Sequence, residues 1–184
     1  MKKLTFCGAM ISAAVFTGLL TLLTALGYVF FCTGWLLSTC ITFGTVFYHF
    51  AMRLAVGALV PATFDHRSAW FQPKTFEAKL YRRLRVKKWK NRMPTYDPQL
   101  FSMPDNTMDA IVSHMCQAEV VHEIIIVGSF LPLLFSLLWG SFWVFFITSV
   151  LAAAIDTSFV IMQRYNRPRM EQLINKYTSR RDTL

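Results

Sequence analysis

The chain has 184 residues, of which 54% are hydrophobic and only 16% are charged, and its mean hydropathy is +0.40. This composition excludes an ordinary soluble domain and indicates a small integral membrane protein. No recognised nucleic-acid-binding fold accompanies the net charge of +9, so we expect anionic lipid headgroups, and not nucleic acid, to be its counterpart.

The first apolar stretch is long enough for two membrane crossings. No charged residue occurs in the 49 positions from Leu4 to Met52, whereas one crossing needs about 20 residues. The sequence therefore predicts spans at about 4–31 and 35–61, with a turn at "CTGW", residues 32–35. Pro61 ends the second span because proline cannot donate a backbone hydrogen bond.

Residues 62–118 are different in character, with ten Lys or Arg against five Asp or Glu. They predict a water-facing basic loop. Within this loop, residues 76–94, "FEAKLYRRLRVKKWKNRMP", place apolar side chains among cations, which is typical of an amphipathic helix on a membrane surface, with Trp89 at headgroup level. A second short helix, starting at Asp105 or Thr107 and ending at Glu119, is indicated by the capping residues in "PDNTMDA".

The second apolar stretch carries no charge from Ile124 to Ile155, which is 32 residues. Two further spans fit only if they extend beyond it, at about 119–138 and 141–163, with a turn at "LLWGS". Residues 164–184 then form a tail. We treat the whole chain, residues 1–184, as a single membrane domain.

The distribution of cations predicts the topology. With four spans, Lys2, Lys3, the basic loop and the six cations of the tail lie on one side, while both opposite turns are uncharged. The positive-inside rule makes that side cytoplasmic. We therefore expect an all-α integral membrane protein of about four transmembrane helices with a basic amphipathic cytoplasmic loop, located in the cell membrane, with both termini cytoplasmic.

The stretch "AEVVHEIII" places Glu119, His122 and Glu123 at the start of the third span. Residues three or four apart share a helix face, so Glu119 can orient His122 as a general base. The alternative is a set of interfacial residues or a polar seam between helices. No metal site is predicted, because "HEIII" lacks the second histidine of a zincin and the four cysteines are scattered. His114 and Glu119 form an H-x4-E pattern that loosely resembles the H-x4-D of soluble glycerolipid acyltransferases.

A second candidate site is "QRYNRPRM", where the last span reaches water. Its guanidinium groups are suited to bind phosphate or carboxylate, although a stop-transfer anchor is the alternative. The predicted substrate-binding residues here are Arg164, Tyr165, Asn166, Arg167 and Arg169.

The basic loop is a third candidate, since it could hold a phosphorylated donor such as coenzyme A, or simply anionic lipid. Trp89 and Lys90 are its candidate binding residues. In the second span, Arg53 is expected to pair with Asp156 or Glu123 and so to neutralise buried charge.

Three elements in order, "VKKWKNRMP", "AEVVHE" at the head of a span and "QRYNRPRM" at the close of the last span, resemble the glycosyl-4,4'-diaponeurosporenoate acyltransferase family of bacterial membrane proteins. The resemblance covers roughly residues 70–175. It implies transfer of a fatty acyl group to a sugar hydroxyl of a glycosylated carotenoid or similar glycolipid, in staphyloxanthin-type carotenoid synthesis. The acyl donor would be acyl-CoA or acyl carrier protein, and no bound cofactor is expected.

In this interpretation His122 is the general base, Glu119 orients it, and the arginines 164, 167 and 169 bind the donor's phosphates or the polar head. Asn166 is a candidate donor to the oxyanion. Two other functional classes stay open: a non-enzymatic membrane scaffold or lipid-binding protein, and a small membrane methyltransferase or reductase of the isoprenylcysteine or steroid type.

Overall fold

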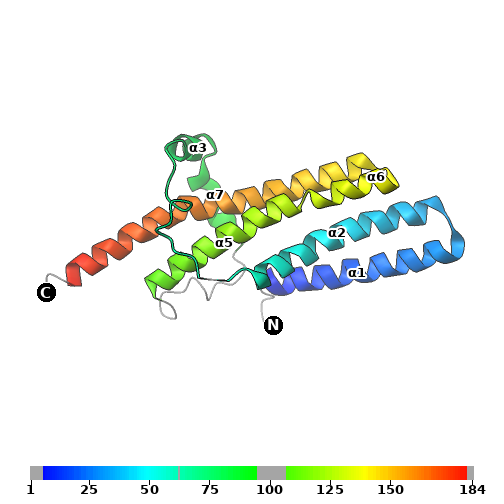
Figure 1. Cartoon of the computed structure of the whole chain (residues 1–184), viewed down its shortest axis with the longest axis horizontal. Coiled ribbons are helices and arrows are strands. Elements are labelled where there is room, and N and C mark those ends of the chain that lie inside the picture. The colour runs from blue at the N-terminus through cyan, green and yellow to red at the C-terminus, as the bar shows by residue number, and fades with distance from the viewer. Residues whose placement is uncertain (1–5, 62, 95–106, 182–184) are drawn as a thin grey trace. The chain divides into compact units, whose positions relative to one another are not determined.

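A computed structural model describes residues 6–61, 63–94 and 107–181 of the chain (Figure 1). Within these ranges all regular secondary structure is helical. In chain order the helices are α1 (Phe6–Phe31), α2 (Gly34–Leu59), α3 (Glu77–Arg83), α4 (Val86–Trp89), η1 (Lys90–Arg92), α5 (Met108–Gly128), η3 (Leu131–Phe135), α6 (Ser136–Trp139) and α7 (Phe142–Arg181).

Four helical stretches are long and apolar enough to cross a membrane, which confirms the predicted all-α membrane class. They are Phe6–Phe31, Gly34–Leu59, Met108–Trp139 and Phe142–Leu173. The third of them runs through α5, η3 and α6. Several hydroxyl groups inside these helices find partners in their own helix: Thr17, Thr21 and Thr24 each donate to a carbonyl four positions earlier, at 2.7 to 2.8 Å. Such pairing is needed where no water is present.

Two tight turns separate the apolar helices. Between α1 and α2, Cys32 has a φ of 49° and its N–H donates to the carbonyl of Tyr28 at 2.8 Å. Between α6 and α7, Gly140 and Ser141 have φ values of 69° and 52°. Glycine adopts such a backbone without strain, which explains its presence at the second turn.

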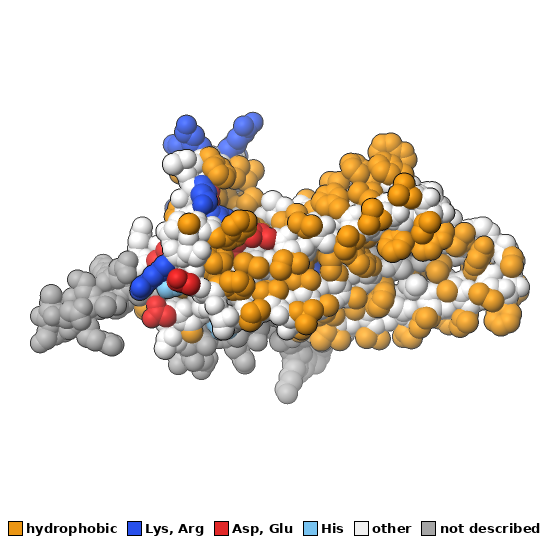
Figure 2. Space-filling view, viewed as in Figure 1, with side chains coloured by type: hydrophobic (Ala, Val, Ile, Leu, Met, Phe, Trp, Pro, Cys, Tyr) orange, Lys and Arg blue, Asp and Glu red, His pale blue; other side chains and the backbone are white. Residues whose placement is uncertain are grey.

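The chain divides into two compact units. The first, here called the apolar unit, consists of Met1–Leu59 and Ile124–Ile155. Its α1 and α2 pack closely because small residues lie between them: a Cβ atom added at Gly18 would lie 3.1 Å from the ring of Phe47. The outer faces of these helices carry exposed Leu, Val and Phe side chains, as expected for contact with lipid, and Figure 2 shows hydrophobic side chains covering this unit.

Polar side chains connect the helices of the apolar unit. The Tyr48 hydroxyl on α2 donates to the carbonyl of Gly128 on α5 at 2.8 Å. Arg53 donates to the carbonyl of His49 at 2.8 Å and to that of Ala152 on α7 at 3.4 Å. The pairing of Arg53 with an acidic residue stays a prediction.

The second unit, here called the polar unit, consists of Val60–Glu123 and Asp156–Leu184. The basic helix expected across residues 76–94 is divided into α3, α4 and η1, because the chain between α3 and α4 takes a left-handed turn at Arg85, where φ is 51°. The short helix expected before Glu119 is continuous with the third span. It begins as the capping pattern indicates, since the Thr107 hydroxyl accepts a hydrogen bond from the N–H of Ala110 at 3.2 Å.

Candidate active site

His122 and Asp156 form a hydrogen-bonded pair between α5 and α7 in the polar unit. The Nδ1 atom of His122 lies 2.8 Å from Oδ1 of Asp156, whose side chain is only 1% exposed. The ring of Phe159 stacks on the imidazole, with centroids 4.6 Å apart and planes 4° apart. Because an ionised carboxylate only accepts hydrogen bonds, Nδ1 is the donor, and Nε2 of the neutral ring is left as the acceptor.

In this geometry the partner of His122 is therefore Asp156 and not Glu119, and a catalytic role for Glu119 stays a prediction. Glu119 is fully buried, and arginines of α7 occupy both of its carboxylate oxygens: Oε1 accepts from Arg164 at 2.5 Å and Oε2 accepts from Arg167. Helix spacing places Glu119 and His122 on the same face of α5, which is why a contact between them was expected. The carboxylate pairs with arginines of α7 instead, because a guanidinium neutralises a buried carboxylate more completely than an imidazole does.

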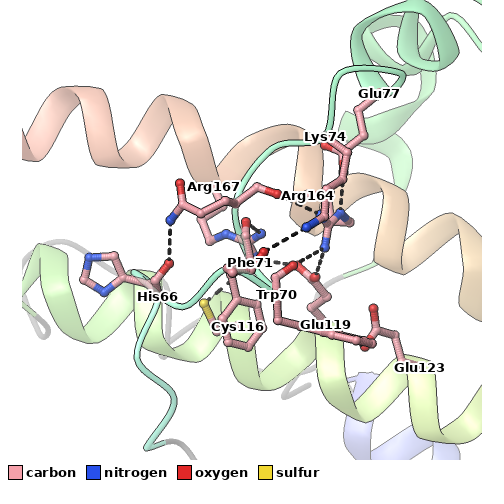
Figure 3. A network of polar contacts seen from close by, with 12 residues as sticks. His66, Trp70, Phe71, Lys74, Glu77, Cys116, Glu119, Glu123, Arg164 and Arg167 are labelled. Carbon is pink, nitrogen blue, oxygen red and sulfur yellow. Dashed lines mark hydrogen bonds and ion pairs between the residues drawn. The ribbon is translucent and has the colours of Figure 1, made fainter.

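Arg164 links three segments of the polar unit (Figure 3). Its guanidinium contacts Glu77 as well as Glu119, with an Nη2 to Oε1 distance of 2.7 Å to Glu77. It also donates to the backbone carbonyls of Trp70 and Gln72, both at 3.2 Å. These contacts attach the segment before α3 to α5 and α7.

Arg167 is more completely enclosed, with only 1% of its side chain exposed. It donates to Glu119 and to the carbonyl of Phe71, and its guanidinium lies 5.1 Å from the centre of the Phe71 ring. Its Nη1 is 3.9 Å from the sulfur of Cys116. Arg164 and Arg167 thus hold the segment 70–77 against α5 and α7. The phosphate-binding role expected for these two arginines stays a prediction.

Glu123 belongs to the edge of this network, where its Oε2 accepts a hydrogen bond from the indole nitrogen of Trp70 at 3.1 Å (Figure 3). Trp70 itself is 61% exposed. Among the described residues, no group of three or more His, Cys, Asp and Glu side chains is arranged to hold a metal ion.

Three further residues of "QRYNRPRM" lie with the basic loop in a group that we call the cationic cluster: Lys87, Lys90, Tyr165, Asn166 and Arg169. The Lys90 ammonium donates to Oδ1 of Asn166 at 2.7 Å and lies 5.1 Å from the centre of the Tyr165 ring. The guanidinium of Arg169 lies 3.7 Å from the same centre. Burial lowers the pKa of Lys90 below its ordinary value, and the charges of Arg169 and Lys87 lower it further.

Comparison with known families identifies the class of protein. A family model described as glycosyl-4,4'-diaponeurosporenoate acyltransferase matches residues 67–176, which is more than half of the chain. The chain belongs to this family. No curated protein and no solved structure matches it.

The chain is thus an acyltransferase of carotenoid biosynthesis, as the resemblance in the sequence predicted. The matched region includes the His122–Asp156 pair, the buried arginines and the cationic cluster, and it excludes α1 and α2. The shared features of the family therefore coincide with the polar unit and the helices that continue from it.

Glu77 and Tyr81 are two residues of the polar network that the sequence analysis did not single out. The Tyr81 hydroxyl donates to Oε2 of Glu77 at 2.8 Å, and its ring meets the edge of Tyr165, with centroids 5.3 Å apart. Burial raises the pKa of Tyr81, and the hydrogen bond to Glu77 raises it further. Their spacing of four places both side chains on one face of α3, which is the signal that the sequence offered.

Two predicted binding residues occupy other places than expected. The indole nitrogen of Trp89 donates to the carbonyl of Leu84 at 3.0 Å, so it closes the turn between α3 and α4. Asn166 is ten residues beyond Asp156, which corresponds to about 15 Å of rise along α7. Asn166 contacts Lys90 in the cationic cluster, and its oxyanion role stays a prediction.

Proposed function

We propose that this acyltransferase esterifies a sugar hydroxyl of a glycosylated carotenoid, glycosyl-4,4'-diaponeurosporenoate or a similar glycolipid, with a fatty acyl group from acyl-CoA or acyl carrier protein. The observation that carries the proposal is the hydrogen bond between His122 and the buried Asp156. A carboxylate that holds an imidazole in one tautomer is the arrangement that a general base for a hydroxyl requires.

In the proposed step, Nε2 of His122 removes the proton from the sugar hydroxyl as the oxygen attacks the carbonyl carbon of the thioester. The carbon–sulfur bond then breaks, and the departing thiolate takes the proton from the imidazolium, which restores the neutral ring. Asp156 stabilises the imidazolium while it exists, and the Phe159 ring keeps the plane of the imidazole fixed.

The acceptor is one that a membrane enzyme can reach. A polyene with a sugar at its end is apolar along its length and polar only at the head, and the four long apolar helices provide a lipid-facing environment for such a molecule. His122 is 21% exposed, which is enough for contact between its Nε2 and a hydroxyl. We place the enzyme in the cell membrane on the same reasoning.

The test compares membranes that contain the wild-type enzyme with membranes that contain His122→Gln. Each is given labelled acyl-CoA and the glycosylated carotenoid, and ester formation is followed by chromatography and mass spectrometry. Loss of the general base should reduce the rate by about 10²-fold or more. His114→Gln, on the same helix, is the matched control and should retain activity. Full ester formation by His122→Gln, at equal protein levels, would contradict the proposed mechanism.

A further inference from the structure

Two groups of basic residues in the polar unit have different surroundings: the pair Arg164 and Arg167, and the cationic cluster. The acids Glu77 and Glu119 are both committed to Arg164 and Arg167. Among the ion pairs of the described residues, none involves Lys87, Lys90 or Arg169. The cluster therefore has an excess of positive charge that this part of the chain does not neutralise.

Within the described parts of the chain, the partners of the cluster are neutral. Lys90 bonds to an amide oxygen, and Lys90 and Arg169 each lie over the electron-rich ring of Tyr165. Arg169 also donates to the carbonyl of Tyr165. An ammonium group has three donors and a guanidinium has five, so most donors of these two cations have no acceptor among the residues that the structure describes.

Asn166 adds a directed donor. Since its Oδ1 accepts from Lys90, its NH2 group is the part of the amide that is left to donate. Lys90, Arg169 and the amide of Asn166 thus offer two positive charges and an N–H donor, which suit the oxygen atoms of a phosphate group. A bound phosphate dianion would also remove the repulsion between the two cations.

We propose that Lys90, Arg169 and Asn166, with Lys87 at the edge, bind a phosphate group, and that in the reaction this group belongs to the acyl donor. The inference rests on the proposed acyl transfer at His122. Its physical basis is spacing: Asn166 lies about 15 Å along α7 from Asp156, so a donor held at the cluster needs a long arm between its phosphate and its thioester. Coenzyme A has such an arm. A phospholipid headgroup offers the same phosphate chemistry and is the other possible source.

The experiment uses purified full-length enzyme in neutral detergent micelles and two donors with the same acyl group: acyl-CoA and the N-acetylcysteamine thioester, which has no phosphate. The wild-type enzyme should prefer acyl-CoA. In the double variant Lys90→Gln/Arg169→Gln, the KM for acyl-CoA should rise by about tenfold or more, while turnover of the phosphate-free thioester stays unchanged. That unchanged turnover also shows that the variant is folded.

The matched control is Arg67→Gln/Lys79→Gln, which removes the same charge from two exposed positions outside the cluster and should keep the wild-type preference.

A second arm of the experiment adds phosphatidylglycerol or phosphatidylcholine to the micelles. If the phosphate is that of a lipid, the double variant loses stimulation by phosphatidylglycerol and keeps its preference for acyl-CoA. A double variant that retains both the donor preference and the lipid response overturns the proposal. Failure of the proposed function is a separate result, namely a His122→Gln enzyme that turns over the phosphate-free thioester normally.

Discussion

At the scale of single residues, Asp156 determines which nitrogen of His122 can act. Its carboxylate is 1% exposed, so water does not compete for the imidazole N–H, and the ring keeps one orientation. Asp156→Asn removes the charge that stabilises the imidazolium and offers an amide that can also donate to Nδ1, which would lock the other tautomer. We expect kcat to fall by about 10²-fold or more, with little change in KM.

The measurement is the steady-state kinetics of ester formation in membranes with equal amounts of each variant. Asp109→Asn, an exposed position in the first turn of α5, is the control and should behave as wild type. A normal kcat for Asp156→Asn would show that His122 does not depend on this carboxylate.

A substitution of Glu119 distinguishes a structural role of this residue from a catalytic one. Glu119→Gln leaves the guanidinium of Arg167 buried against a neutral amide, and removal of one partner from a buried ion pair costs about 3 kcal/mol or more. We therefore expect a clear drop in the melting temperature of the purified enzyme. Glu123→Gln, whose partner is the exposed Trp70, should melt close to wild type. An unchanged melting temperature together with lost activity would return Glu119 to the chemistry.

The sequence was sufficient to locate "AEVVHE" and "QRYNRPRM" but not to pair their residues. Asp156 lies 34 positions from His122, and only the packing of α5 on α7 brings the two side chains together. The difference in position among the three arginines of this motif could, by contrast, be predicted from the sequence. Successive helix positions are about 100° apart, so Arg164 and Arg167 share a face, while Arg169, two positions beyond Arg167, points nearly the opposite way.

At the scale of helices, Gly128 is a point of close approach between α2 and α5 in the apolar unit. A Cβ atom built there would lie 2.5 Å from the sulfur of Met52. Gly128→Ile should therefore overpack this contact and disturb the hydrogen bond from Tyr48, at a cost of about 1 to 3 kcal/mol. The readout is the melting temperature in detergent.

Gly57 provides the matched control, because it lies in α2 and a Cβ atom there meets nothing within 4 Å. Gly57→Ile changes helix propensity in the same way without overpacking, so the difference between the two variants isolates the contact with Met52. Equal melting temperatures would mean that the Met52 side chain moves aside at no cost.

Helix type followed from the sequence, whereas helix ends depended on packing. The four apolar stretches are long and nearly free of charge, so only helices can satisfy their backbone in lipid. The start of the third span was harder to predict. The charges of Glu119 and Glu123 suggested a boundary there, but α5 begins at Met108 and runs through both residues without a break. Its first turns are held by packing, since Ile111, Val112 and Met115 are buried.

At the scale of the whole chain, an even number of spans requires both termini to lie on the same side of the membrane. The two turns between apolar helices carry no charge, while ten Lys or Arg lie in residues 62–118 and six more follow from Arg164 onward. The positive-inside rule then predicts that the polar unit is cytoplasmic, where coenzyme A and acyl carrier protein are available.

Native Cys32 offers a direct test of this topology, because it is exposed at the turn between α1 and α2, whereas Cys116 is buried. A membrane-impermeant maleimide should label Cys32 in intact cells, and Cys32→Ser should abolish that labelling. On the Cys32→Ser background, Ser141→Cys, at the other uncharged turn, should react in intact cells, and Ser68→Cys, an exposed position in the polar unit, should react only after permeabilisation. Labelling of Ser68→Cys in intact cells would show that the topology is inverted. The cationic cluster would then lie on the side of the membrane where the cytoplasmic acyl donor is absent. This one result therefore bears on both the membrane arrangement and the identity of the bound phosphate.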